Sequence, residues 1–314
     1  MRAPWPPEVL ATGYAGIDII ARIRRPVEPG WTGIIEETAP EPSRGGCAPN
    51  VAVGLARLGI STGVAMVVGD DPEGREYVRA LQAEGVDTRH VHVVPGGRTP
   101  RTYLFVPPEG PTSLFFDPGA AAQWTAAIEV DLHGVRLAVL TVGPPQYNRQ
   151  FAAQAVAAGL PLAWQLKGDL SAYPPDLVRE FVAGSRFIFM NRLEAAYAAA
   201  VFGVPAVADL LRRGPEAIFI TSGPQGSEVL TAGGSQVVPA APATVVDPTG
   251  AGDAYTAGVL AAMLRGWTAG EAAQLGAVVA AFVVEAWGCQ TALPAWEAAV
   301  ARYTAVFGPL PGRV

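Results

Sequence analysis

The sequence predicts an α/β protein with a mainly parallel central sheet flanked by helices. The first observation is that continuous apolar runs alternate with segments of helical spacing. The apolar runs, which we expect to be strands, are 64–68, 137–142, 162–166, 187–190 and 217–221. Strands that are apolar throughout are typical of a parallel sheet with helices on both faces, and such sheets bind ligands beyond the carboxyl ends of their strands.

The second observation is the set of helical patterns that follow these runs. They cover 72–84, 148–158, 174–182 and 193–201, with a short helix at 207–212. The C-terminal third, 252–306, is predicted as three helices that break near Gly266 and Gly288. A helical crossover after each strand is the connection that a parallel pair requires.

Two segments depart from this alternation. Residues 17–44 and 98–117 are turn-rich and alternate in polarity, and Pro107–Gly110 is expected at a hairpin tip. We expect the two segments to pair as a small β-lid over the sheet edge, inserted in a single domain that spans residues 1–314.

Composition excludes several classes of function. Of 314 residues, 50% are apolar and 16% are charged, the net charge is −6, and no basic run indicates a nucleic-acid binder. The longest apolar run, Leu275–Val284, is shorter than the about 20 residues that span a bilayer. We therefore predict a cytoplasmic protein without nucleic-acid or membrane partners. Lys167 is the only lysine, which we interpret as a compositional bias without bearing on the substrate.

The most informative motif is the stretch DPTGAGDA at 247–254, which follows a β-branched segment and opens an apolar helical one. Unpaired N–H groups at the start of a helix bind anions. An acid there, Asp253, is unusual unless it serves a reaction, and a base beside an anion site is what phosphoryl transfer to an alcohol needs. The alternative is an ordinary loop whose first-turn acid suits the helix dipole.

Two motifs precede it in the chain. Gly45 and Gly46 lead through Asn50 into a helical run, and paired glycines let a backbone approach a polyol closely. Asp18 ends the first strand segment, where a carboxylate accepts hydrogen bonds from hydroxyl groups. The alternatives are a helix entry capped by Asn50 and a solvated Asp at a strand end.

Two further motifs follow strands. Asn191 and Glu194 begin a helix after 187–190, either as part of the water shell of Mg²⁺ or as a capping box, and both interpretations are compatible. Thr221, Gly223 and Gly226 follow the strand 217–221 and suit a nucleotide, although a plain turn between strands has the same composition.

In this order the motifs resemble the ribokinase (PfkB) family of sugar and nucleoside kinases, from about Val9 to about Trp296. GGCAPNVAVGLARLG at 45–59 resembles one family signature and DPTGAGDAYTAG at 247–258 the other. The resemblance implies a ribokinase-like three-layer sandwich, with a β-lid that often mediates dimers. It also implies an ATP-dependent phosphotransferase that acts on an alcohol group.

The resemblance assigns a role to each matching position. Asp253 is implied as the general base, and the anion hole as the N–H groups of Gly250, Ala251 and Gly252. The implied substrate contacts are Asp18, Gly45, Gly46 and Asn50. The implied ATP contacts are Asn191, Thr221, Gly223 and Gly226. Glu194 is implied in holding Mg²⁺ through water, and Asp247 and Thr249 in a monovalent-cation site, with K⁺ as the candidate ion.

Departures from the family pattern leave the acceptor open. Gly16 stands where ribokinases carry Asn, Cys47 follows the glycine pair, and 163–167 lacks an Asp-x-Asn motif. The segments 273–276 and 285–290 resemble bacterial adenosine kinases. We therefore place a small sugar first and a nucleoside, adenosine above all, as the close alternative. A non-catalytic sensor of sugars or nucleotides is the third hypothesis.

Aromatic and cationic side chains add candidates for substrate binding. Tyr14, Tyr103, Phe105 and Trp164 are candidates for stacking on a base, with core or lid packing as the alternative for each. The chain has no Walker A lysine, so Arg101 in the lid is a candidate for neutralising phosphate charge, with an exposed lid charge as its alternative.

Overall fold

The computed structural model describes residues 6–110, 112–169 and 172–312, and its centre is a nine-stranded sheet in the order β14-β13-β12-β11-β10-β9-β1-β5-β6. All neighbours from β12 to β6 pair in parallel, and β13 and β14 add an antiparallel edge. The mainly parallel sheet is therefore confirmed. The strands are β1 (Val9–Thr12), β5 (Thr62–Gly69), β6 (Asp87–Val94), β9 (Leu137–Leu140), β10 (Leu162–Gln165), β11 (Phe187–Asn191), β12 (Ala217–Thr221), β13 (Ser227–Thr231) and β14 (Gly234–Val238).

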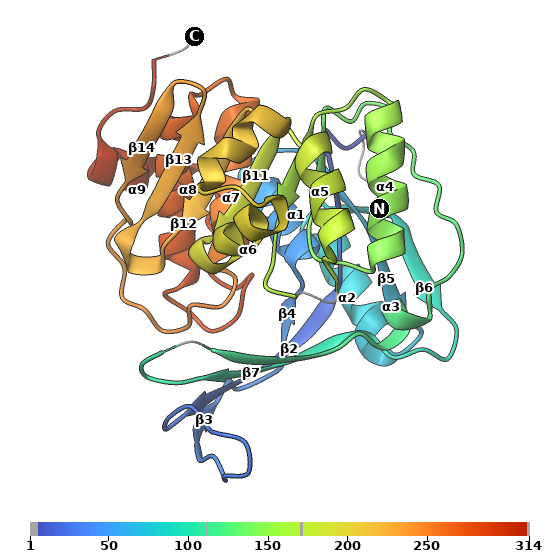
Figure 1. Cartoon of the computed structure of the whole chain (residues 1–314). Coiled ribbons are helices and arrows are strands. Elements are labelled where there is room, and N and C mark those ends of the chain that lie inside the picture. The colour runs from blue at the N-terminus through green and yellow to red at the C-terminus, as the bar shows by residue number, and fades with distance from the viewer. Residues whose placement is uncertain (1–5, 111, 170–171, 313–314) are drawn as a thin grey trace.

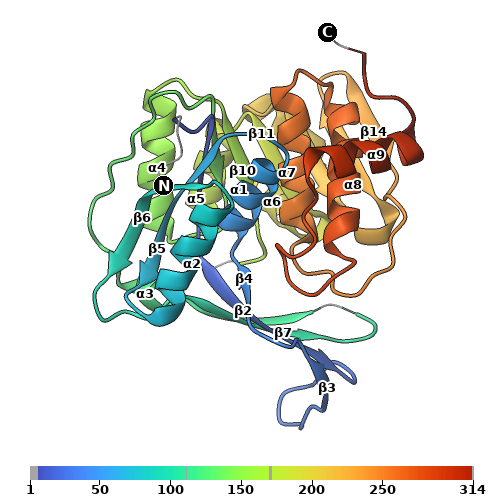
Figure 2. The ribbon, with the colours of Figure 1, turned by 180° about the vertical axis from the view of Figure 1, so that it is seen from behind.

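Helices cover both faces of this sheet because its strands are apolar on both sides. In β1, Val9 and Ala11 join one buried cluster and Leu10 joins the other. Figure 2 shows the helices of the first face: α1 (Cys47–Arg57), α2 (Pro72–Ala83), α7 (Ala251–Leu264), α8 (Ala269–Val283) and α9 (Trp296–Phe307). Figure 1 shows those of the other face: α4 (Pro145–Ala157), α5 (Pro175–Gly184) and α6 (Arg192–Phe202). The result is the predicted three-layer sandwich.

Two short helices and three C-terminal helices complete the layers around the sheet. A short helix, α3 (Gly119–Gln123), also contributes to the second cluster, and the predicted short helix after α6 is the 3-10 helix η1 (Val207–Arg213). The C-terminal third forms three helices, α7 to α9, and the breaks between them contain Gly266 and Gly288, as the sequence predicts. Among the described residues no single helix is long and apolar enough to cross a membrane, although the bent pair α6 and η1 meets that criterion by length and composition.

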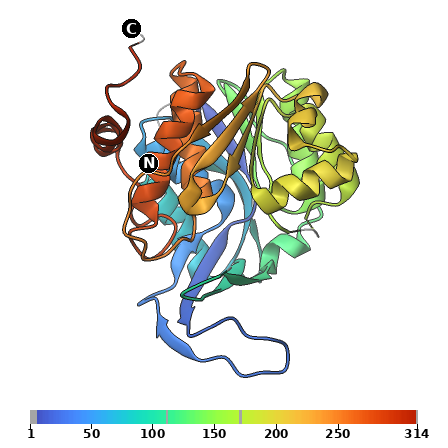
Figure 3. The same cartoon turned by 60° about the vertical axis from the view of Figure 1, so that its left-hand side comes forward.

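A second, smaller sheet lies below the central one in Figure 1 and projects from it in Figure 3. Its order is β3-β2-β7-β8, with β4 paired to β2. The strands are β2 (Gly16–Ile23), β3 (Ile35–Thr38), β4 (Ser43–Gly45), β7 (Arg101–Val106) and β8 (Ser113–Asp117). The two segments expected to form a lid therefore do meet in one sheet, and the expected tip at 107–110 lies between the antiparallel strands β7 and β8.

Candidate active site

The glycine loop and Asp253 lie at the start of α7. Gly250 is the residue before the helix and has φ +79°, a left-handed conformation. A Cβ at this position would lie 2.7 Å from the Cβ of Cys289, so both conformation and packing require glycine. Asp253 follows in the first turn of the helix and is only 2% exposed.

Asp253 is held by side chains from two parts of the fold, the start of α1 and the carboxyl end of β10. Its Oδ2 accepts a hydrogen bond from Nδ2 of Asn50 at 2.8 Å, and its Oδ1 accepts one from Nε2 of Gln165 at 2.7 Å. The Nζ of Lys167 lies 3.8 Å from Oδ1. Gln290 donates in turn to Oδ1 of Asn50 at 2.9 Å. We call this buried chain of Gln290, Asn50, Asp253 and Gln165 the base network.

Asn50 belongs to the base network and does not cap α1. Asn50 lies in the first turn of α1, but the helix is preceded by Gly46 at φ +87°, and no side chain caps it. The capping alternative for Asn50 is therefore wrong, because the Asn50 side chain faces Asp253 instead. Its predicted contact with substrate stays a prediction.

Asp18 lies within β2 of the small sheet, beside the glycine pair Gly45–Gly46, so its predicted place at the end of the first strand is wrong, since β1 already ends at Thr12. It is 4% exposed, so the solvated alternative is wrong. A Cβ at Gly45 would lie 1.9 Å from Oδ2 of Asp18, which means that the glycine makes room for this carboxylate. Burial raises the pKa of Asp18 to about 6, although hydrogen bonds from Cys289 and Thr102 oppose this rise.

The N–H groups of the glycine loop differ in their availability. The N–H of Ala251 donates to the carbonyl of Pro248 at 3.3 Å, a long turn hydrogen bond. Within residues 6–110, 112–169 and 172–312, the N–H groups of Gly250 and Gly252 donate to no acceptor. Such free donors at a helix start are able to bind an anion.

Asp247 and Thr249 fasten this loop to a neighbouring one. Oδ1 of Asp247 accepts from the N–H of Thr249 at 2.9 Å and also from its hydroxyl, while Oδ2 accepts from the N–H of Gly288 at 2.9 Å. Both carboxylate oxygens are thus engaged within the chain. Asp247 therefore holds the glycine loop against the loop that contains Gly288. The monovalent-cation site at Asp247 and Thr249 stays a prediction.

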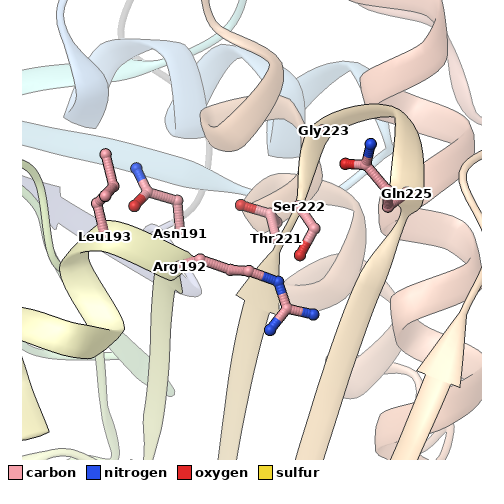
Figure 4. Close-up of a pocket in the computed structure, with 7 residues that line it drawn as sticks. All are labelled: Asn191, Arg192, Leu193, Thr221, Ser222, Gly223 and Gln225. Atoms are coloured by element: carbon pink, nitrogen blue, oxygen red, sulfur yellow. The ribbon is translucent and has the colours of Figure 1, made fainter.

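A second region lies at the carboxyl ends of β11 and β12. A cavity of about 420 Å³ is lined by Asn191, Arg192, Leu193, Thr221, Ser222, Gly223 and Gln225, and Figure 4 shows these residues. Gly223 opens the short 3-10 helix η2 (Gly223–Gln225) between β12 and β13, so the turn interpretation is confirmed. Gly226 is outside the lining and is needed for packing, because its Cβ would lie 2.1 Å from the carbonyl oxygen of Val238.

The capping box predicted for α6 is present. Oδ1 of Asn191 accepts from the N–H of Glu194 at 2.9 Å, and Oε2 of Glu194 accepts from the N–H of Asn191 at 2.7 Å. Burial raises the pKa of Glu194, and the charge of Lys167 opposes this rise. In the described part of the chain no group of three or more His, Cys, Asp or Glu side chains is placed to hold a metal. A divalent ion would therefore need phosphate and water ligands besides Glu194.

Sequence reasoning missed three side chains at the base. Gln165, Lys167 and Gln290 carry no recognisable motif, although Gln165 and Lys167 lie at the carboxyl end of β10, where ligands of parallel sheets bind. Arg101, the candidate cation, is paired with Glu73 at 2.7 Å and is not an exposed lid charge.

The four aromatic candidates for base stacking lie in three different places: the core, the small sheet and the junction of the two sheets. Trp164 is fully buried in the core against Tyr173 and Phe181, so the packing alternative holds. Tyr103 and Phe105 lie on the small sheet, where Phe105 contacts Phe115 edge-on. Tyr14 follows β1 and packs against Phe116 of β8, with 4.6 Å between the ring centroids. Tyr14 is the one candidate of the four that joins the central sheet to the lid.

The three-layer sandwich, the buried Asp253 at a glycine-rich helix start and the small lid sheet fit a kinase that acts on small molecules. Residues 8–296 match the family model described as pfkB family carbohydrate kinase. The chain therefore belongs to the pfkB family of carbohydrate kinases. The expectation of a phosphotransferase with a hydroxyl acceptor is confirmed at the level of this family.

Individual relatives cover nearly the whole chain. A nucleoside kinase of Methanothermobacter thermautotrophicus is 30% identical over 306 residues, which are 97% of this chain and 98% of that protein. A nucleoside kinase of Methanocaldococcus jannaschii is 29% identical over 94% of this chain and 96% of its own length. The crystal structure of the latter superposes with a TM-score of 0.82 over 95% of this chain and 98% of that chain. An ATP-dependent ribose-1-phosphate kinase of Halopiger xanaduensis is 30% identical over 82% of this chain and 84% of that protein.

Proposed function

We propose that the protein transfers the γ-phosphoryl group of ATP to a hydroxyl group of a nucleoside. The observation that carries the reaction type is the buried carboxylate of Asp253, which lies directly beside the free N–H groups of Gly250 and Gly252. A base and an anion hole at one helix start are the two components that an alcohol phosphorylation requires.

The residues act as follows. Asp253 removes the proton of the acceptor hydroxyl, whose oxygen forms a bond to the γ-phosphorus while the bond to the β-phosphate oxygen breaks. The N–H groups of Gly250, Ala251 and Gly252 stabilise the charge on the transferred group. Asp18 and Asn50 bind the other hydroxyl groups of the acceptor, with Gly45 and Gly46 giving the acceptor close access to the backbone.

The donor nucleotide is assigned to the 420 Å³ cavity at the ends of β11 and β12. Asn191, Thr221 and Gly223 line it, and they are the positions that the family resemblance assigns to ATP. Gly226 then acts by shaping the turn that carries Gly223. The Halopiger relative is named for its use of ATP, which supports ATP as the donor.

The acceptor is proposed from two lines of support. The relatives that match almost end to end, at 29% and 30% identity, are nucleoside kinases. Tyr14 and Phe116 also place an aromatic pair where the lid meets the central sheet, and aromatic faces favour a planar base. A small sugar, the first expectation from the sequence, is the second candidate, because a sugar-phosphate kinase is 30% identical over a shorter part of the chain.

One assay separates these hypotheses. ADP release is measured with Mg-ATP against nucleosides, pentoses, hexoses and sugar phosphates. Turnover with nucleosides alone supports the proposal, and turnover with free sugars alone replaces it by the second candidate. Binding without turnover on every acceptor would identify the chain as a sensor and reject the kinase assignment.

Magnesium is the implied metal, and it would neutralise charge on the donor phosphates. Glu194 is the residue of this chain that fits such a role, because it is a buried carboxylate at the start of α6, next to the donor cavity. Glu194→Gln is expected to raise the Mg²⁺ concentration needed for half-maximal rate. It also weakens the capping box by about 1 kcal/mol, so the Mg²⁺ titration is compared with a melting curve. An unchanged titration would leave Glu194 with a structural role alone.

Two further properties belong to the proposed function: association of two copies of the chain through the lid, and activation by K⁺. The small sheet exposes Ile35, Leu114 and Phe115, which suits an interface with a second copy of the chain, and sedimentation equilibrium at several concentrations tests this. Exchange of K⁺ for Na⁺ at constant ionic strength tests the cation. A cytoplasmic location without nucleic-acid or membrane partners stays a prediction.

A further inference from the structure

Buried negative charge dominates the surroundings of the glycine loop. Asp18, Asp247, Asp253 and Glu194 are all less than 9% exposed. After burial itself, the charges of Asp253 and Asp247 add to the rise in the pKa of Asp18, and the charge of Asp253 adds to that of Glu194. A nucleotide phosphate that approaches this region is therefore repelled unless a cation compensates, because charges interact strongly where water is excluded.

Lys167 is the cation that lies among these carboxylates. Its Nζ is 3.8 Å from Oδ1 of Asp253, and its charge also acts on Glu194. It thus interacts both with the carboxylate assigned to the acceptor hydroxyl and with the carboxylate assigned to the donor phosphates. In the proposed reaction the phosphoryl group leaves the donor side, to which Glu194 is assigned, and reaches the acceptor side, to which Asp253 is assigned.

Other cations near the site are placed differently. Arg101 is committed to Glu73 on α2. Arg192 lines the donor cavity with a side chain that is 66% exposed, and it extends across β12 in Figure 4, toward Glu228 at 4.0 Å. Neither side chain contacts Asp253, and the main-chain N–H groups of the glycine loop carry only partial charges.

The Lys167 ammonium makes no hydrogen bond to Asp253, and part of its side chain is exposed. The separation of 3.8 Å from Asp253 exceeds a hydrogen bond, and 37% of the side chain is exposed. Asp253 is already held by two amide donors, Asn50 and Gln165, so its orientation does not depend on Lys167. A flexible stem with three donors is suited to following a phosphoryl group from donor to acceptor.

We propose that Lys167 binds the γ-phosphate of the donor and stays with the phosphoryl group as it moves to the acceptor. This inference rests on the proposed kinase function. The lysine remains protonated throughout, because the proton of the acceptor hydroxyl goes to Asp253. The only lysine of the chain would then serve catalysis, contrary to our compositional interpretation.

Amine labelling of the wild-type protein tests the contact directly. Because the chain has one lysine, the amines that an acetylating N-hydroxysuccinimide ester can modify are Lys167 and the α-amino group. The reaction is run at alkaline pH, since neighbouring negative groups raise the pKa of Lys167 and the ester reacts with the free amine. Peptide mass spectrometry separates the two products. A saturating, non-hydrolysable Mg-ATP analogue is expected to slow labelling of Lys167 by about tenfold or more and to leave the α-amino rate unchanged. Equal labelling with and without the bound analogue would overturn the inference.

Substitution tests the catalytic contribution. Lys167→Met is expected to lower kcat by about 10² to 10³, the usual effect of removing one donor to developing charge, and Lys167→Arg to restore part of it. Arg149→Met, which removes an exposed cation paired with Asp176 and Glu180, is the matched control and should retain the wild-type rate. A kcat for folded Lys167→Met within twofold of wild type contradicts the inference.

A purely structural role gives a different result. If Lys167 only balances the charge of Asp253, the methionine variant shifts the pH profile and the melting temperature, and the nucleotide analogue does not protect Lys167. If the wild-type protein phosphorylates no acceptor, the proposed function fails. The labelling result still decides whether the lysine meets a nucleotide phosphate.

Discussion

The acceptor side and the donor side of the site are built in opposite ways. Around Asp253, side chains from α1, β10 and the loop after α8 form a buried base network with short hydrogen bonds. The donor cavity, by contrast, is lined largely by the ends of two strands and the start of α6, and its Arg192 and Leu193 are exposed.

This difference indicates how the two substrates are handled. The acceptor side is preorganised, since its donors already point at the base before any ligand binds. The donor side is a turn and a helix start that offer main-chain groups to a nucleotide. Substitutions on the acceptor side should therefore lower kcat, and those on the donor side should mainly raise KM for ATP.

The largest expected effect comes from Asp253→Asn. The amide cannot accept the proton of the acceptor hydroxyl, so kcat should fall by about 10³ or more, while the affinity for ATP changes little. Single-turnover kinetics and equilibrium nucleotide binding measure the two quantities. A kcat close to wild type would remove Asp253 from the role of base.

Gly250→Ala should be the next most severe change. The added Cβ would meet Cys289 at 2.7 Å and also forces alanine to φ +79°, so both the loop and its packing have to shift. We expect kcat to fall by about 10² through displaced N–H groups. The melting temperature should fall as well, because left-handed backbone costs alanine about 1–2 kcal/mol. A variant with normal kcat and lowered stability would mean that the loop is structural only.

The pH profile tests the acceptor side through Asp18. Because burial raises the pKa of this carboxyl to about 6, it is mostly protonated below that pH, loses its charge and becomes a weaker acceptor with one O–H donor. We expect kcat/KM for the acceptor to fall about tenfold per unit below pH 6. The ionised group costs stability, and that cost disappears as the pH falls from about 6 to 4. Asp18→Asn should remove the inflection, and its persistence in that variant would assign it to another group.

Gly223→Ala is the matched counterpart of Gly250→Ala and should have the smallest effect. Its φ is also positive, at +55°, but no atom lies within 4 Å of the added Cβ. We expect a loss of about 1 kcal/mol in stability from the backbone alone. KM for ATP should rise a few-fold, with kcat retained. A large fall in kcat here would contradict the contrast between the two sides.

Much of this arrangement was predictable from local patterns. Apolar runs and helical spacing gave the parallel sheet and its layers, and the order of the glycine motifs indicated the kinase family. The capping box of Asn191 and Glu194 was readable because it lies within four residues of one helix start. Asp253 stood out because an acid at an anion-binding helix start is chemically unusual.

The remaining contacts depend on residues far apart in the chain. Asn50 is 203 positions from Asp253, Gln290 is 240 positions from Asn50, and Cys289 is 271 positions from Asp18. No local spacing encodes such pairs, and a lone Gln or Lys has no distinctive pattern. The motif identified Asn50 as a candidate. Only the fold showed that its side chain faces Asp253 and does not cap α1.

The sequence by itself determined the fold class, the family and the identity of the acid at the glycine loop, because periodicity and short motifs are properties of neighbouring residues. The tertiary structure decided what surrounds that acid. Packing of α1 and α7 on one face of the sheet, together with the carboxyl end of β10, brings Asn50, Gln165 and Lys167 to Asp253. Burial then raises the pKa of Asp18, a property that no residue has until the chain excludes water from it.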